Sequence, residues 1–177
     1  MSSYSKLIIF ILVLLFISAA IIFIDSSMDN INKTMPDISD SVVNGNKEYN
    51  EAVQLVNDKS FDEAKSKAIS AGDNYNSSLN QLNDIRNNFS SDITNVQKEY
   101  IDTVIKELEL KINAVNNLKE AIGCFELNSN YTGTTYASQA NDLIYEASEY
   151  QYERDSIVEN NSDLFKQQNF IIWYMGF

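Results

Sequence analysis

Acidic side chains are the most abundant groups in this chain that could do chemistry. The sequence holds 25 Asp and Glu residues against 13 Lys and Arg, with no His and a single Cys. Without His, and with one Cys, the usual ligand sets for zinc, haem and iron–sulfur clusters are missing, and a His-based catalytic triad is excluded. We therefore expect no cofactor, no metal site and no catalytic residue, and interpret the protein as a non-enzyme.

Carboxylates alone could still form a catalytic pair or a calcium site. The sequence contains no D-x-D-x-D-G loop with a later Glu and no Gly-rich phosphate loop. Asp37 and Asp40 form one acidic group, and Asp58, Asp62 and Glu63 form another. Both groups fit helix N-termini, where negative charge is favourable. A hydrolase with two carboxylates about 5–10 Å apart in a cleft is the weakest of three hypotheses.

Arg154 is the cation best placed to bind a small ligand. It lies four residues after Tyr150 and three before Ile157, on the apolar phase of its predicted helix. A guanidinium there, beside Tyr150, could hold a carboxylate ligand. The simpler interpretation is that the Arg154 stem packs in the core while its head reaches a neighbouring Glu or Asp.

Four stretches with an apolar or aromatic residue at every seventh position must supply the framework for these groups. The stripes are Met28, Met35, Val42, Tyr49 and Val56; Phe61, Ala68, Tyr75, Leu82 and Phe89; Ile101, Leu108, Val115 and Ile122; and Tyr136, Leu143, Tyr150, Ile157 and Leu164, with Ala140 and Ala147 beside them. This spacing predicts helices over 25–57, 61–88, 92–126 and 134–166, each with one apolar seam. The predicted fold is all-α: an up-down-up-down antiparallel four-helix bundle with coiled-coil-like packing.

Pro36 and Gly45 interrupt the first predicted helix. Pro removes a backbone donor and clashes with the preceding turn, so a kink or a break is expected at Pro36. The stripe keeps its phase from Met28 to Val56, which favours one kinked helix over two separate helices. The seams also contain Tyr residues, whose hydroxyls need partners, and Ala residues small enough to face them.

An apolar run precedes the predicted bundle. Leu7–Ile24 contains 18 residues without a charge, which is long enough for a candidate transmembrane helix and longer than the apolar region of a cleaved signal peptide. We interpret residues 1–24 as a cytoplasmic stub and an N-terminal transmembrane signal anchor, and 25–166 as an extracytoplasmic bundle. Cleavage near Ser18-Ala19-Ala20 and a buried soluble helix are the alternatives.

The charges that flank this run predict its orientation. Lys6 precedes it, whereas Asp25 and Asp29 follow it and the next cation is Lys33. The positive-inside rule therefore places the N-terminus in the cytoplasm and the rest of the chain outside, as a single-pass protein of the cell membrane.

The tail 167–177 is the most apolar and aromatic stretch outside the anchor. In an up-down-up-down bundle the tail returns to the membrane end. Trp and Tyr favour the membrane interface, so we expect Phe170, Trp173, Tyr174 and Phe177 to contact the outer headgroup region. The alternatives are that the tail caps the bundle or is the remnant of a second span.

Two resemblances accompany this pattern. Ser60–Ala71 reads SFDEAKSKAISA and resembles the second helix of a tetratricopeptide repeat, with its aromatic residue, two acids and Ala. The closing Pro and a second copy at 34 residues are missing, so the segment is interpreted as ordinary helix packing. In architecture, a span followed by four long helices is similar to the extracytoplasmic sensor domains of chemoreceptors.

The expected function is that of a non-catalytic, membrane-anchored helical bundle with an acidic extracytoplasmic domain, acting as an interaction or structural module. The alternative is a small-ligand-binding, sensor-like domain that works with another membrane protein. Expected partners are the lipid bilayer and a protein, either a different one or a second copy. Nucleic acid is not expected, because a phosphate backbone needs a cationic face and this chain has a net charge of −12.

Overall fold

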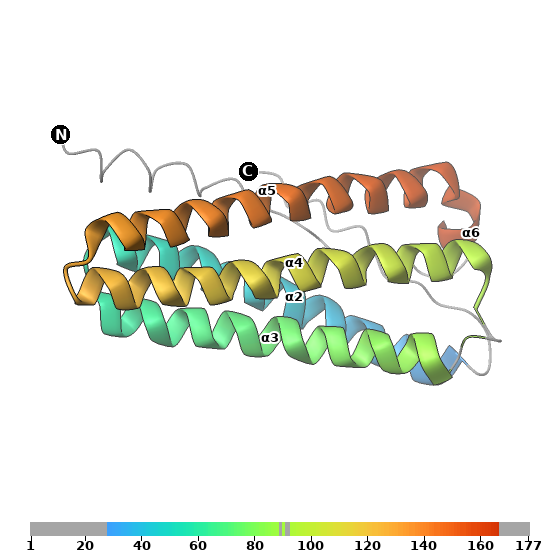
Figure 1. Cartoon of the computed structure of the whole chain (residues 1–177). Coiled ribbons are helices and arrows are strands. Elements are labelled where there is room, and N and C mark those ends of the chain that lie inside the picture. Colours follow the sequence, from blue (N-terminus) through green and yellow to red (C-terminus); the bar gives the residue numbers. More distant parts are fainter. Residues whose placement is uncertain (1–27, 89, 91–92, 167–177) are drawn as a thin grey trace.

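A computed structural model gives the arrangement of residues 28–88, 90 and 93–166, which are the residues described below. They form α2 (Met28–Asn57), α3 (Phe61–Asn88), α4 (Asn95–Glu126), α5 (Asn130–Asn160) and the short α6 (Ser162–Lys166). Within these ranges there is no strand. The all-helical prediction is therefore confirmed for the described part of the chain (Figure 1).

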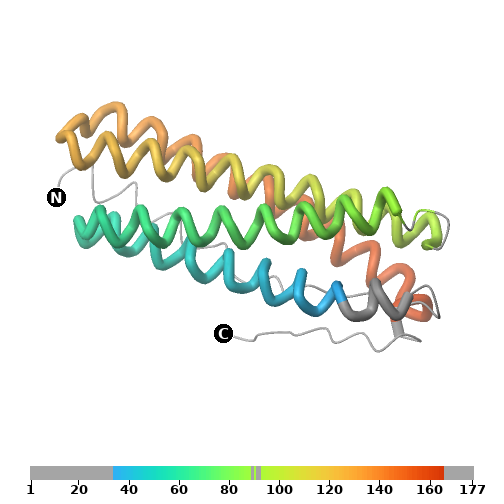
Figure 2. Tube along the Cα trace, turned by 90° about the horizontal axis from the view of Figure 1, so that it is seen from below, coloured from blue at the N-terminus to red at the C-terminus, as the bar shows by residue number. Residues whose placement is uncertain are grey.

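The four long helices lie side by side and alternate in direction (Figures 1 and 2). The turns that join α2 to α3 and α4 to α5 lie at one end of the bundle, and the α3–α4 connection lies at the other. The start of α2 and the short α6 share that second end. The chain therefore enters and leaves the bundle at the same end.

α4 is the central helix of this arrangement. Close backbone approaches join α2 to α3, α3 to α4 and α4 to α5, whereas those between α2 and α4 are sparse. α2 and α5, which would complete the ring, do not approach each other in the same way. The bundle is therefore two helical hairpins joined through α3 and α4.

Three of the four predicted seams form the core. The described seam residues of α2, α3 and α4 that are buried are Met35, Val42, Tyr49, Val56, Ala68, Tyr75, Leu82, Ile101, Leu108, Val115 and Ile122. Phe61 is half-buried and stacks on Phe125, with ring centroids 6.3 Å apart. Apolar residues on a seven-residue spacing thus pack against one another, as expected.

The prediction for the fourth seam is confirmed only in part. Ala140, Ala147 and Ile157 are buried as predicted, whereas Tyr136, Leu143, Tyr150 and Leu164 are only half-buried. The buried line of α5 consists of Gly133, Ala137, Ala140, Ile144, Ala147, Arg154, Ile157 and Val158. The physical reason is size, because small residues on α5 accommodate large ones on its neighbours.

Glycines mark the closest of these contacts. A Cβ added at Gly133 would clash with the Phe125 ring. A Cβ added at Gly45 would lie 2.6 Å from Cε1 of Tyr75. In the sequence, Gly45 looked like an interruption of the first helix. Its lack of a side chain leaves room for the Tyr75 ring.

The first two long helices match their predicted extents closely. α2 runs without a break through Pro36, which is exposed on its surface. α3 has the predicted bounds, and the Ser60 carbonyl oxygen accepts a hydrogen bond from the Ala64 backbone N–H, so Ser60 occupies the N-cap position.

The predicted ends of the last two long helices need correction. α4 begins at Asn95 rather than at 92, because Thr94 and Gln97 form a capping box. α5 begins at Asn130 rather than at 134, so the helix already includes Gly133. α5 ends at Asn160, and α6 follows with Phe165 buried against the Tyr100 ring at 5.9 Å between centroids.

Two predictions concern segments outside the described residues. The anchor Leu7–Ile24 and the tail with Phe170, Trp173, Tyr174 and Phe177 both lie there. Among the described helices, none has the length and apolar character needed to cross a bilayer.

Replacing Gly45 by Ala tests the close contact of α2 with α3. The added methyl meets a buried ring held at both ends, so we expect Gly45→Ala to lower the free energy of unfolding by about 1–3 kcal/mol. Gly123→Ala is the matched control, because a Cβ there meets nothing within 4 Å and Ala favours a helix over Gly by about 1 kcal/mol. Urea unfolding of the full chain in detergent, followed by circular dichroism, measures both. Equal stability of the two variants would contradict this packing.

Candidate functional site

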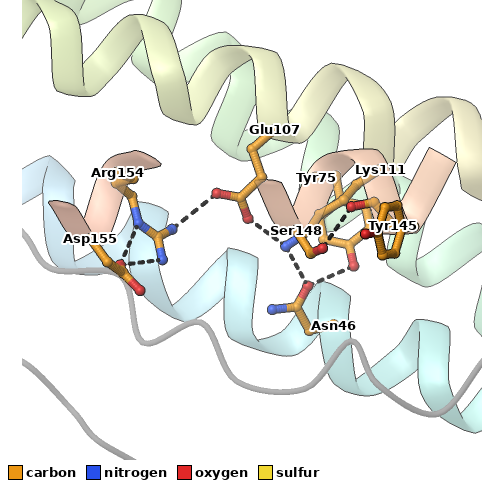
Figure 3. Close-up of polar contacts among 8 residues, drawn as sticks. All are labelled: Asn46, Tyr75, Glu107, Lys111, Tyr145, Ser148, Arg154 and Asp155. Carbon is orange, nitrogen blue, oxygen red and sulfur yellow. Dashed lines mark hydrogen bonds and ion pairs between the residues drawn. The ribbon is translucent and has the colours of Figure 1, made fainter. Parts of the chain in front are cut away.

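A buried carboxylate lies at the centre of the bundle, held by two buried cations. Glu107 and Lys111 come from α4 and Arg154 from α5, and their side chains are at most 1% exposed. Lys111 Nζ lies 2.7 Å from Glu107 Oε1, and Arg154 Nη1 donates to Glu107 Oε2 at 3.0 Å (Figure 3). Each oxygen of the carboxylate therefore has its own cation.

The same group of contacts reaches α2 and α3. Asn46 on α2 accepts two hydrogen bonds at its Oδ1, one from Lys111 Nζ at 3.0 Å and one from the Tyr75 hydroxyl at 2.8 Å. Lys111 Nζ also lies 5.7 Å from the centroid of the Tyr75 ring on α3. All four long helices thus contribute to one polar cluster, which we call the Glu107 network: Asn46, Tyr75, Glu107, Lys111 and Arg154 (Figure 3).

A fourth charge balances the network. Arg154 Nε and Nη2 donate to Asp155 Oδ1 at 3.3 and 3.2 Å, and the Asp155 side chain is half-exposed. Two cations therefore face two carboxylates, one deep and one at the surface. This neutrality matters because an unpaired buried charge is costly in a low-dielectric interior.

Burial also shifts the proton equilibria of these groups. Burial lowers the pKa of Lys111, and the neighbouring Glu107 opposes that shift. Burial raises the pKa of Asp155, and Arg154 opposes it. Burial raises the pKa of the Tyr75 hydroxyl well above its ordinary value, and Glu107 adds to the effect. Burial therefore keeps the Tyr75 hydroxyl neutral, whereas burial and Glu107 act on the pKa of Lys111 in opposite directions.

Tyr49 adds a buried hydroxyl that the network does not use. Its side chain lies on the seam of α2, one turn from Asn46, and is 1% exposed. Among the described residues its hydroxyl has no hydrogen-bond partner. Burial raises the pKa of this hydroxyl. A buried donor of this kind is a cost to the fold unless something binds it.

Of the two residues predicted to contact a ligand, only Arg154 lies in the network. Its head reaches Glu107 and Asp155, which is the simpler of the two interpretations of its sequence position. Tyr150 lies half-buried on the flank of α5, with Lys106 Nζ 5.5 Å from its ring centroid. A ligand contact by Arg154 or Tyr150 stays a prediction.

The acidic groups singled out in the sequence lie at the surface. Those exposed are Asp37, Asp40, Asp58, Asp62 and Glu63. Asp62 and Glu63 lie in the first turn of α3, as expected. Asp37 and Asp40 lie inside α2, so their assignment to a helix N-terminus was wrong. No group of three or more Cys, Asp and Glu side chains in the described part of the chain is arranged to hold a metal ion.

Sequence reasoning missed Glu107 and Lys111, although their spacing carries a signal. Glu107 belongs to a line of buried residues on α4 that are spaced seven apart, namely Tyr100, Glu107, Ala114 and Ala121. Lys111 belongs to a second series, which contains Val104, Lys111, Leu118 and Phe125. A single charge inside an otherwise apolar or small-residue series therefore predicts a buried charge that needs a partner.

Comparison with known proteins gave no match to a protein-family model, a curated protein or a solved structure.

Glu107→Gln tests whether the carboxylate holds the network together. The substitution leaves Lys111 and Arg154 buried without their shared anion, so we expect a loss of about 3–5 kcal/mol in the free energy of unfolding. Glu109→Gln makes the same change at an exposed position on the same helix, and we expect less than about 0.5 kcal/mol there. Urea unfolding of the full chain in detergent measures both. A Glu107→Gln loss no larger than that of the control would contradict the network.

Tyr49→Phe tests the unpartnered hydroxyl, with a sign that depends on pH. At pH 8 the removal of an unpaired buried donor leaves stability unchanged or raises it by up to about 1 kcal/mol. Tyrosine in the unfolded chain has a pKa of about 10. Burial raises the pKa of Tyr49 in the fold, so its hydroxyl stays protonated there at higher pH. Stability of the wild type therefore falls as pH rises above that point, and Tyr49→Phe makes the fall shallower.

The control for that experiment is Tyr152→Phe, because the Tyr152 side chain is 73% exposed. We expect it to leave both the stability and its pH dependence unchanged. Unfolding free energies at pH 8 and pH 11 make the comparison. A loss of more than about 1 kcal/mol in Tyr49→Phe at pH 8 would show that the hydroxyl has a favourable partner.

Proposed function

We propose that this protein is a non-catalytic, single-pass membrane protein whose acidic helical bundle acts outside the cell membrane as an interaction or structural module. In this proposal residues 1–24 are the cytoplasmic stub and signal anchor. Residues 25–166 form the extracytoplasmic bundle, and 167–177 form the apolar tail.

The Glu107 network is the observation that supports this proposal best. Its charged groups are directed at one another across four helices, through Glu107, Lys111 and Arg154. Catalytic carboxylates and lysines act on a substrate, so they need an approach from solvent and a group left free to react. Glu107 and Lys111 are instead at most 1% exposed and already paired. Such pairing suits a scaffold that presents its outer surface to a partner.

The direction of the helices supports the membrane arrangement. α2 follows the proposed anchor in the sequence. The start of α2 and the short α6 lie at the same end of the bundle (Figure 1). If Leu7–Ile24 spans the bilayer, α6 brings the tail back to the same side of the bundle. Phe170, Trp173, Tyr174 and Phe177 are then in reach of the outer headgroups, where aromatic residues are favoured.

Chemical labelling of single cysteines tests this topology. Cys124 is the chain's one cysteine, so Cys124→Ser provides a background for two new sites. Ser129→Cys places a thiol at an exposed position in the turn between α4 and α5, and Ser3→Cys places one in the stub. We expect a membrane-impermeant maleimide to label Ser129→Cys in intact cells and Ser3→Cys only after permeabilisation. The reverse pattern, or protection of both until lysis, would contradict the proposal.

A sensor-like domain that binds a small anion is the second candidate. It is favoured by the excess of buried positive charge over buried negative charge. Lys111 and Arg154 are two cations around one fully buried carboxylate, and Asp155 is half-exposed. A small carboxylate could take the place of Asp155 on Arg154. Acetate or benzoate should then raise the unfolding temperature of the full chain relative to chloride at equal ionic strength. A flat response would remove this candidate.

A further inference from the structure

The outward side of α5 carries an unusual combination of exposed aromatic and acidic side chains. Tyr145 and Tyr152 are 70% and 73% exposed and lie seven residues apart, so they project from the same side of the helix. Tyr131 is 88% exposed and lies two such intervals before Tyr145. Tyr is enriched in protein interfaces, because it offers a large rigid surface and a polar tip.

Carboxylates surround these rings. Glu149 lies four residues after Tyr145 and three before Tyr152, which places it between them on the helix surface. Asp142 lies three residues before Tyr145, and both acids are exposed. We define the α5 outer face by six exposed residues, Asp142, Tyr145, Glu146, Glu149, Tyr152 and Glu153.

The charge of this face is one-sided. α5 contains six acidic residues and a single cation, Arg154, which is buried in the Glu107 network. The other three long helices each expose a cation, namely Lys47 on α2, Lys65 on α3 and Lys106 on α4. The α5 outer face therefore combines ring faces and negative charge with no exposed cation of its own helix to neutralise them.

We infer that the α5 outer face docks a basic segment of a partner protein, rich in Lys or Arg. A cation over a Tyr ring and beside a carboxylate is stabilised by both. The protein already contains one such contact on the flank of the same helix, where Lys106 Nζ lies 5.5 Å from the Tyr150 ring centroid. The inference rests on the proposed role as an interaction module and names the chemistry of its partner.

Charge also decides against the other occupants of this face. A second copy that docked through the same face would bring the same acidic helix against itself, and like charges in contact are unfavourable. An anionic membrane surface would be repelled for the same reason. A basic protein segment is the occupant that complements both the rings and the carboxylates.

Binding of a synthetic peptide to the full chain in neutral detergent tests the inference. The probe is a decapeptide of alternating Arg and Gly, and calorimetry gives its dissociation constant. Tyr145→Gln with Tyr152→Gln removes both rings without changing the charge, and we expect binding to weaken by roughly tenfold because both cation–π contacts are lost. The far-ultraviolet circular dichroism of this variant should match the wild type, because both rings are exposed.

A pair of charge variants separates this face from the general acidity of the chain. Glu149→Gln with Glu153→Gln removes two charges from the α5 outer face, and Asp73→Asn with Asp84→Asn removes two exposed charges from α3. We expect at least fivefold weaker binding for the α5 pair and less than twofold for the α3 pair. Equal losses in the two charge pairs, or unchanged binding in the Tyr pair, would overturn the inference. The labelling experiment on membrane topology would be unaffected by that result.

Discussion

The Glu107 carboxylate is the constraint on which the arrangement of the helices depends. It is nearly inaccessible to water and is paired with Lys111 and Arg154. Through Lys111 and Asn46 the pairing extends to α2, and through the Tyr75 hydroxyl it extends to α3. An apolar seam can slide by one turn at modest cost, whereas a displaced buried charge loses its partner. Buried polar groups are known to fix register in helical assemblies, and we assign that role to Glu107 here.

The helices of the bundle are unevenly packed. α2 and α5 do not approach each other as the other neighbours do, although Asn46 on α2 and Arg154 on α5 both belong to the Glu107 network (Figure 3). On α5 the buried line is made of Gly, Ala and Arg154, so the helix approaches α4 closely and sends one long side chain inward. Its large aromatic residues are left on the flank and at the surface, which is where the proposed partner surface lies.

Much of the fold could be predicted from the sequence, because most of its core is apolar and periodic. α3 was predicted with its observed bounds, and α2 was correctly expected to continue through Pro36. The seam of α5 could be predicted only in part. Ala140, Ala147 and Ile157 were placed in it and are buried. Gly133 and Ala137 were missed, because they are small and Tyr136 and Leu143 outweigh them on any apolar scale. Their burial follows from the space next to Phe125 and the other large residues, which is a property of the tertiary structure.

The network itself was predictable in part. Arg154 was expected on the core side of its helix with a carboxylate as partner, and the seam Tyr residues were expected to need hydrogen bonds. The carboxylate that Arg154 meets depends on how far α5 is shifted along its axis relative to α4. A single sequence carries no information about that shift. Glu107 and Lys111 are also four residues apart on one helix, a spacing typical of ordinary surface ion pairs.

The most direct test of this account is the stability of Glu107→Gln combined with Lys111→Met. If the Glu107 network is a set of mutually compensating charges, removal of Lys111 relieves the uncompensated cation that Glu107→Gln creates. Arg154 then keeps Asp155 as its partner. The account predicts that the double variant is more stable than Glu107→Gln alone, by at least about 1 kcal/mol in the free energy of unfolding. A double variant that loses the sum of the two single losses would contradict it.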